Sequence, residues 1–260
     1  MTKMCRMLVA SGNFDVNSLI DSVILMAKNE NEPTKLADEP KRFTHPDGWG
    51  LAYLSDGRWI VKKSTKAIFK DPSIDKLRNI KTNLLIIHVR KKVGSEISIE
   101  NTHPFQIEHP VIGSCVFCHN GFIEEKIFFD QRYKPKGKTD SEKLFYSILT
   151  DFDRTKDIRA AIRINFQRYH PERGTNIIFA TKTKTYVGAR ENNLPKYYQM
   201  SIGKDGQAVV ISSERLKTLP GFYWKVLPQG SIAVIKNGAA ICNITSKNSF
   251  MHRLRSRFRL

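Results

Sequence analysis

The chain of 260 residues carries 43 lysines and arginines against 25 aspartates and glutamates, a formal net charge of +18. Its length can bury one substantial core, and a content of 40% hydrophobic and 26% charged residues is that of an ordinary folded domain. No apolar run approaches the roughly 18 residues of a membrane span, and no secretory-type apolar segment follows the first basic residues. We therefore expect one domain, 1–260, in the cytoplasm.

The positive charge attracts anionic partners in general but identifies none of them. The sequence has no zinc-finger spacing, no RNP-type aromatic motif and no glycine-rich KH loop, so we expect no specific nucleic acid partner. Its four cysteines are irregularly placed and predict no disulfide framework.

The first predicted element is a short apolar strand in 4–10, headed by Cys5. The stretch 17–27 then repeats apolar residues at helical spacing, with Asn17 or Ser18 as the expected N-cap. These two elements predict a helix that packs on a sheet.

The polar segment 29–44 contains two prolines and is expected to be a surface loop. Two glycines, Gly48 and Gly50, introduce the next strand and predict a positive φ or a close backbone contact. Residues 55–58 have the composition of a hairpin turn, and 59–61 begin the returning strand. Two consecutive strands favour an antiparallel sheet.

A short amphipathic helix is expected over 71–79, followed by a continuous apolar run, 83–89, typical of a strand buried on both faces. That strand delivers Arg90 at its end. Residues 111–117 predict another buried strand, which stops at Asn120-Gly121.

A helix begins near Asp140, with Thr139 or Asp140 as its cap, and a second helix is expected over 158–166. The remaining strands are predicted over 175–180, 185–189, 208–212 and 231–236. Strands, then helices, then strands predict an α+β layered domain with mostly antiparallel sheets. The last residues, 246–260, form a basic C-terminal tail.

Cys5 could serve as an N-terminal nucleophile. A free α-amino group has a pKa near 8 and can accept the thiol proton directly or through a water molecule. This chemistry requires that residues 1–4, a leader or propeptide, be removed. Either methionine removal after a start at Met4 or autocatalytic cleavage would achieve it.

Four further residues fit the needs of amide hydrolysis. Asn120 and Gly121 offer a side-chain amide and a closely approachable backbone N–H to an oxyanion. Arg90 can bind the carboxylate of an amino acid substrate in a bidentate pair, and Asp140 can hold its ammonium group.

Taken together and in order, these motifs resemble those of class II glutamine amidotransferases, which are N-terminal-nucleophile hydrolases. The resemblance rests on 4–6, 47–50, 88–90, 101–105, 119–121 and 139–142, with a weaker similarity at 212–216. It is greatest to the stand-alone subfamily without a synthase domain. It implies a four-layer αββα sandwich and no cofactor, with Cys5 as nucleophile, Asn120 and Gly121 as oxyanion hole, Arg90 and Asp140 as glutamine-binding residues, and His103 as a positioning residue.

The loop after Arg90 departs from the family pattern, because Lys91-Lys92-Val93 replaces small or aromatic and hydroxyl-bearing residues. A γ-glutamyl peptide or amide is therefore an alternative small-molecule substrate to glutamine. A second alternative is a catalytically silent binding protein on the same fold that contacts anionic partners. Any ammonia acceptor would be a separate synthase, and the oligomeric state is not predicted.

The segment 115–119 spells the attachment motif of c-type haem, and Cys115 and Cys118 have the spacing of two zinc ligands. Haem attachment does not occur in the cytoplasm, and two further zinc ligands are not evident. We expect no metal here.

Overall fold

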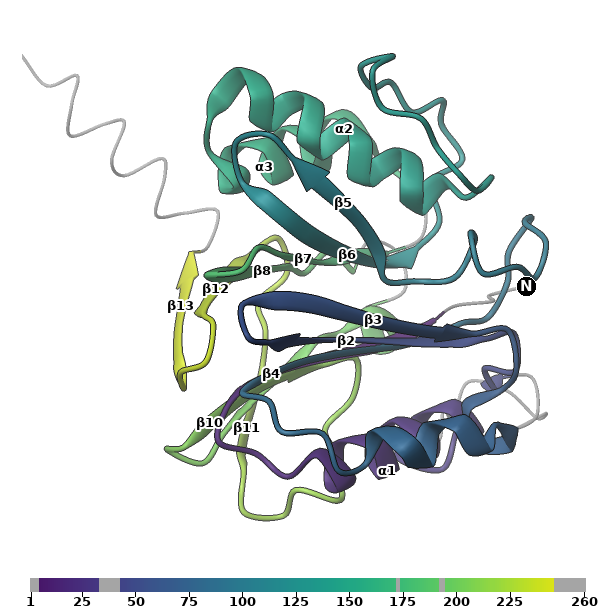
Figure 1. Cartoon of the computed structure of the whole chain (residues 1–260). Helices are drawn as coiled ribbons and strands as arrows, with labels where there is room; N and C mark the ends of the chain where they lie inside the picture. The colour runs from purple at the N-terminus through teal and green to yellow at the C-terminus, as the bar shows by residue number, and fades with distance from the viewer. Residues whose placement is uncertain (1–4, 33–42, 172–173, 192–194, 246–260) are drawn as a thin grey trace, which may run out of the picture.

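The computed structural model describes residues 5–32, 43–171, 174–191 and 195–245. The predicted leader 1–4 and the basic tail 246–260 lie outside the described residues. Within those ranges, two antiparallel sheets pack face to face, and helices cover the outer side of each (Figure 1). The fold is the four-layer αββα sandwich expected from the sequence.

One sheet has seven strands and the other has six, and every pair of neighbouring strands is antiparallel. In spatial order, the first contains β11 (Tyr223–Val226), β9 (Ser201–Lys204), β10 (Ala208–Ser212), β1 (Arg6–Gly12), β4 (Leu84–Val89), β2 (Trp49–Ser55) and β3 (Arg58–Ser64). The second contains β13 (Ile241–Thr245), β12 (Ile232–Lys236), β8 (Lys184–Gly188), β7 (Thr175–Ala180), β6 (Gly113–Gly121) and β5 (Phe105–His109).

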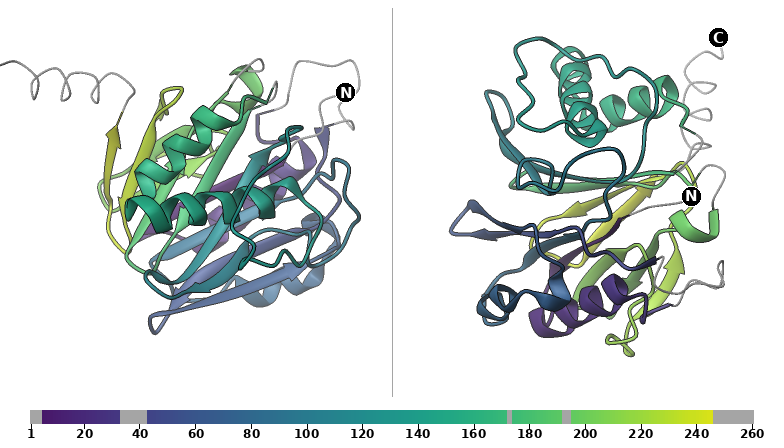
Figure 2. Two further views of the ribbon diagram at one scale, coloured as in Figure 1. Left: turned by 90° about the horizontal axis from the view of Figure 1, so that it is seen from above. Right: turned by 90° about the vertical axis from the view of Figure 1, so that its right-hand side faces the viewer.

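The helices form the two outer layers, as the turned views in Figure 2 also show. Helix α1 (Val16–Lys28) lies on the first sheet, whereas α2 (Asp140–Thr155) and α3 (Ile158–Arg168) lie on the second. The described residues also form the short helix α4 (Pro195–Tyr198) and the 3₁₀ helices η2 (Ile68–Lys70) and η3 (Pro72–Leu77). No helix in the described ranges has both the length and the hydrophobicity needed to cross a bilayer.

Strand alternation assigns each side chain to a layer. In β1, Met7 and Val9 belong to the core between the sheets, whereas Leu8 and Ala10 pack toward α1. Because successive side chains point to opposite faces of a sheet, Cys5 continues the Met7 and Val9 series. The fold therefore directs the candidate nucleophile into the space between the sheets.

The glycine predictions are confirmed. Gly48 has a φ of +122°, and a Cβ atom on Gly50 would lie 1.9 Å from the carbonyl oxygen of His103. The hairpin turn between β2 and β3 places Asp56 and Gly57 in the left-handed region, with φ values of 49° and 69°. Such angles at both central residues suit the twist of the flanking strands.

Two local predictions are wrong. Helix α1 is capped by Asp15 rather than by Asn17 or Ser18, because the Asp15 carboxylate accepts the backbone N–H groups of those two residues. The helix expected over 71–79 is the 3₁₀ helix η3. Its buried side chains, Ile74 and Leu77, are three residues apart, the spacing that lines up on a 3₁₀ helix.

Candidate active site

Strand register places Cys5 beside Arg90. In the antiparallel pair of β1 and β4, Arg6 lies opposite Val89, so the preceding Cys5 meets the end of β4. The Cys5 thiol lies 3.7 Å from the carbonyl oxygen of Lys91, to which it donates. Two segments far apart in the sequence thus meet at one end of the two interior strands β1 and β4.

The second sheet contributes Asn120 to the same space. In β6, Val116 and Cys118 belong to the core between the sheets, and alternation adds Asn120 to this face. The His88 ring in β4 is hydrogen-bonded through Nε2 to the carbonyl oxygen of His119, over 3.3 Å, which joins the ends of the two strands. Cys5, Arg90 and Asn120 therefore project between the sheets at the same end.

Asn120 is fully buried, yet neither atom of its side-chain amide has a hydrogen-bond partner among the described residues. Leaving a buried polar group unpaired costs about 1–3 kcal/mol, so such groups in native proteins call for an explanation. A donor held free in this way suits an oxyanion that forms only during a reaction.

Gly121 follows at the end of β6. A Cβ atom here would lie 2.1 Å from the carbonyl oxygen of Gly174 and 2.5 Å from Nε2 of His119. Packing therefore excludes any side chain, and this requirement accounts for the glycine whether or not its N–H contacts a substrate.

Arg90 is only 3% exposed. Its Nη2 donates to the Ser95 hydroxyl, at 2.8 Å, and to the carbonyl oxygen of Glu96, at 2.9 Å, whereas Nη1 has no partner among the described residues. The loop after β4 thus fixes the guanidinium and leaves one of its edges available for a carboxylate.

Asp140 is the first residue of α2, and the Thr139 hydroxyl caps the helix by accepting the Glu142 N–H at 3.1 Å. The Asp140 carboxylate accepts the Ile123 N–H at 2.9 Å. Burial raises the pKa of this carboxyl group to about 6. It is therefore mostly ionised at neutral pH and can attract an ammonium group.

His119 supports Asp140 without forming an ion pair with it. The imidazole Nδ1 is hydrogen-bonded to the Ser141 hydroxyl at 2.9 Å and lies 3.8 Å from the Asp140 carboxylate. Burial lowers the pKa of His119 to about 3, so the ring is neutral at physiological pH. Its contribution is to fix the start of α2 on β6.

The Cys5 thiol is a weak acid in this setting. Burial raises its pKa to about 11, although the nearby Arg90 guanidinium acts in the opposite direction. The thiol is thus protonated at neutral pH, and a nucleophilic role requires a base.

His103 is buried and contacts two other aromatic rings. Its ring packs on His88, with centroids 4.1 Å apart, and edge-on against Phe105, at 4.6 Å. Neither ring nitrogen has a hydrogen-bond partner among the described residues. These contacts support the ends of β4 and β5.

Sequence reasoning missed a buried ion pair next to Cys5. The Arg6 guanidinium donates to Glu214 at 2.7 Å and lies 3.8 Å from the centre of the Tyr197 ring. Glu214 also accepts the Asn31 side-chain amide at 2.9 Å. The only sequence signal was the weak similarity at 212–216, which gives no indication that Glu214 pairs with an arginine some two hundred positions earlier.

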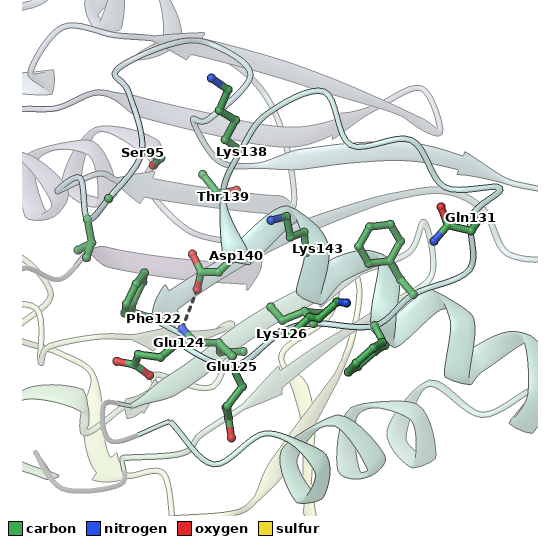
Figure 3. A pocket seen from close by; sticks show the side chains of 16 residues that line it. Ser95, Phe122, Glu124, Glu125, Lys126, Gln131, Lys138, Thr139, Asp140 and Lys143 are labelled. Atoms are coloured by element: carbon green, nitrogen blue, oxygen red, sulfur yellow. Dashed lines mark hydrogen bonds between the residues drawn. The ribbon is translucent and has the colours of Figure 1, made fainter.

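A cavity of about 750 Å³ opens beside Asp140 (Figure 3). Three segments line it: the loop at 93–95, residues of 122–131, and the start of α2 with the residues just before it.

The residues in the haem-like and zinc-like motif do not converge. Cys115 belongs to the core under α2 and α3, whereas Cys118 belongs to the core between the sheets. In the part of the chain that the structure describes, no group of three or more histidine, cysteine, aspartate or glutamate side chains is arranged to hold a metal ion.

Known proteins are similar to this chain in sequence. An uncharacterized protein of Methanocaldococcus jannaschii is 27% identical over 230 residues, which cover 76% of this chain and 63% of that protein. A Haemophilus influenzae protein provisionally named a glutamine amidotransferase is 34% identical over 134 residues, 46% of this chain and 45% of that one. The chain thus spans less than two thirds of the length of either relative.

Among solved structures, the glutamine phosphoribosylpyrophosphate amidotransferase of B. subtilis aligns over 93% of this chain and 49% of its own, with a TM-score of 0.64 and 18% identity. This likeness shows a shared N-terminal-nucleophile fold. The sequence model of the class-II glutamine amidotransferases matches residues 33–174, more than half of the chain, a range that includes Arg90, Asn120 and Asp140 but not Cys5. The chain belongs to the class-II glutamine amidotransferase family.

Proposed function

We propose that this protein hydrolyses the side-chain amide of glutamine through a thioester on Cys5 and releases ammonia. The observation that carries the proposal is the buried, unpartnered amide of Asn120, which projects into the same space as Cys5 and Arg90. In the proposed reaction, this amide donates to the oxyanion that forms when Cys5 attacks a bound amide.

The reaction begins once residues 1–4 are removed and the α-amino group of Cys5 is free. This amine takes the thiol proton, and Sγ attacks the carboxamide carbon of the substrate. Asn120 and the backbone N–H of Gly121 stabilise the oxyanion. The C–N bond then breaks, the proton passes to the leaving nitrogen as ammonia, and water hydrolyses the thioester to glutamate.

Two charged groups would hold the amino acid end of the substrate. The free edge of Arg90 would bind the α-carboxylate, and the Asp140 carboxylate would accept from the α-ammonium group. In the chain that still carries residues 1–4, burial raises the pKa of the Cys5 thiol to about 11, which fits a nucleophile that needs the free terminal amine as its base.

The test is ammonia release from glutamine by the protein, by Cys5→Ala and by a matched control, Cys242→Ala, a partly buried cysteine in β13. We expect loss of activity only in Cys5→Ala, with unchanged far-UV circular dichroism in both variants. Full activity of Cys5→Ala would refute the proposal. The same assay with γ-glutamyl peptides examines the alternative substrate class, and an ammonia-accepting partner stays a prediction.

A further inference from the structure

The cavity beside Asp140 adjoins the proposed substrate site. Asp140 forms part of its wall, whereas Cys5, Asn120 and Arg90 do not. Asp140 also acts electrostatically on the Cys5 thiol, so its carboxylate lies near the nucleophile as well as in the cavity wall. A group attached to the α-nitrogen of a bound glutamine would pass Asp140 and enter this space.

The cavity is too large for glutamine alone. Glutamine has about ten non-hydrogen atoms and fills no more than about 300 Å³, at the roughly 30 Å³ that a water-sized group occupies in a liquid. Its carboxamide must also lie near Cys5, outside the cavity. The cavity of about 750 Å³, which is open to solvent, therefore has room for a larger substrate.

The lining beyond Asp140 combines aromatic surface with charges of both signs, three lysines and two glutamates. Lys143, on the first turn of α2, has no ion pair among the described residues, and the ammonium group of Lys126 lies 5.4 Å from the centre of the Phe128 ring. In Figure 3 the carboxylates of Glu124 and Glu125 extend away from Lys143. Glu125 also accepts the His170 N–H at 2.8 Å.

We propose that the preferred substrate is a glutamine whose α-nitrogen carries an acyl group with a carboxylate, seated in this cavity against Lys143 and Lys126. The inference rests on the proposed function and specifies its substrate class. An amide N–H can donate to Asp140 as an ammonium group would, and the α-carboxylate still meets Arg90. The reaction consumes one water and yields the N-acylglutamate and ammonia.

The experiment compares kcat/KM for ammonia release from glutamine, N-acetylglutamine, N-succinylglutamine and glutaminylglycine, with protein whose N-terminal residue is Cys5. We expect N-succinylglutamine to exceed glutamine by about tenfold or more, with N-acetylglutamine between them. In Lys143→Glu, the ratio of kcat/KM for N-succinylglutamine to that for glutamine should fall about tenfold. The matched control is Lys184→Glu, an exposed position outside the cavity with the same charge change.

Equal or better turnover of glutamine would overturn the inference and leave the proposed function standing. A preference for glutaminylglycine would also overturn it, because that peptide extends the carboxyl side. Binding to Cys5→Ala by calorimetry separates the two claims. If no compound is hydrolysed, the proposed function fails. Tighter binding of N-succinylglutamine than of glutamine would then still support the role of the cavity. If N-succinylglutamine binds no more tightly than glutamine, that role is refuted.

Discussion

At the scale of single residues, Asn120 is the strongest indication of chemistry. Its amide is buried without a partner among the described residues, so its removal should cost little stability. We expect Asn120→Ala to lower kcat for glutamine about 10²–10³-fold with little change in KM, because an oxyanion donor acts in the transition state. Steady-state kinetics and a thermal melt of the same sample check this.

Asn176 provides the matched control, because it lies directly opposite Asn120 in β7. Its amide donates to the Tyr198 carbonyl at 2.6 Å and accepts the Arg190 N–H at 2.8 Å. Asn176→Ala should therefore destabilise the fold by about 1–3 kcal/mol. If Asn120→Ala is more destabilised than Asn176→Ala and keeps the kcat of the unaltered protein, the role of Asn120 is structural.

The pKa of Asp140, about 6, gives a pH dependence with a definite sign. Above this value the group is a carboxylate that attracts the substrate ammonium, and below it the charge is lost. We expect KM for glutamine to rise as pH falls through about 6, while Asp140→Asn has a raised KM that no longer varies over this range. Initial rates between pH 5 and 8 test this, with Glu125→Gln, from the same cavity, as the control. A KM that is flat for the unaltered protein would contradict the assigned role.

At the scale of elements, the start of β1 is anchored by the buried pair of Arg6 and Glu214, whose side chains are 4% and 5% exposed. Removing one partner leaves a buried charge unpaired, so Arg6→Met should cost about 3–5 kcal/mol in the free energy of unfolding. Arg78→Met, which removes exposed ion pairs to Asp21 and Asp75, should cost no more than about 1 kcal/mol. Urea denaturation measures both, and equal losses would show that the pair does not stabilise the strand.

Element prediction succeeded where the sequence pattern was local. The continuous apolar run of β4 and the turn residues of the β2–β3 hairpin identified those elements. Strands β5, β9, β11 and β13 were not predicted. Each is only four or five residues long, and β5, β11 and β13 lie at the edges of their sheets. Such strands depend on the neighbour with which they pair more than on their own composition.

At the scale of the whole molecule, the family resemblance predicted the layers, and strand alternation explains how they unite the site. Cys5, Arg90 and Asn120 were each identifiable from sequence, but their common orientation depends on the register of β1, β4 and β6. The Arg6 pair with Glu214 and the cavity beside Asp140 were not predictable, because both arise from contacts between segments far apart in the chain.

We propose that Cys5, once it is the N-terminal residue, is the nucleophile of a glutamine-shaped site. The most direct measurement is the intact mass of the protein before and after treatment with an electrophilic glutamine analogue, followed by peptide mapping. We expect a mass that lacks residues 1–4 and a single adduct on Cys5, whose formation free glutamine slows. Two results together would contradict this expectation. The protein would have its full-length mass without an adduct, and it would stay unreactive when produced with Cys5 as its first residue.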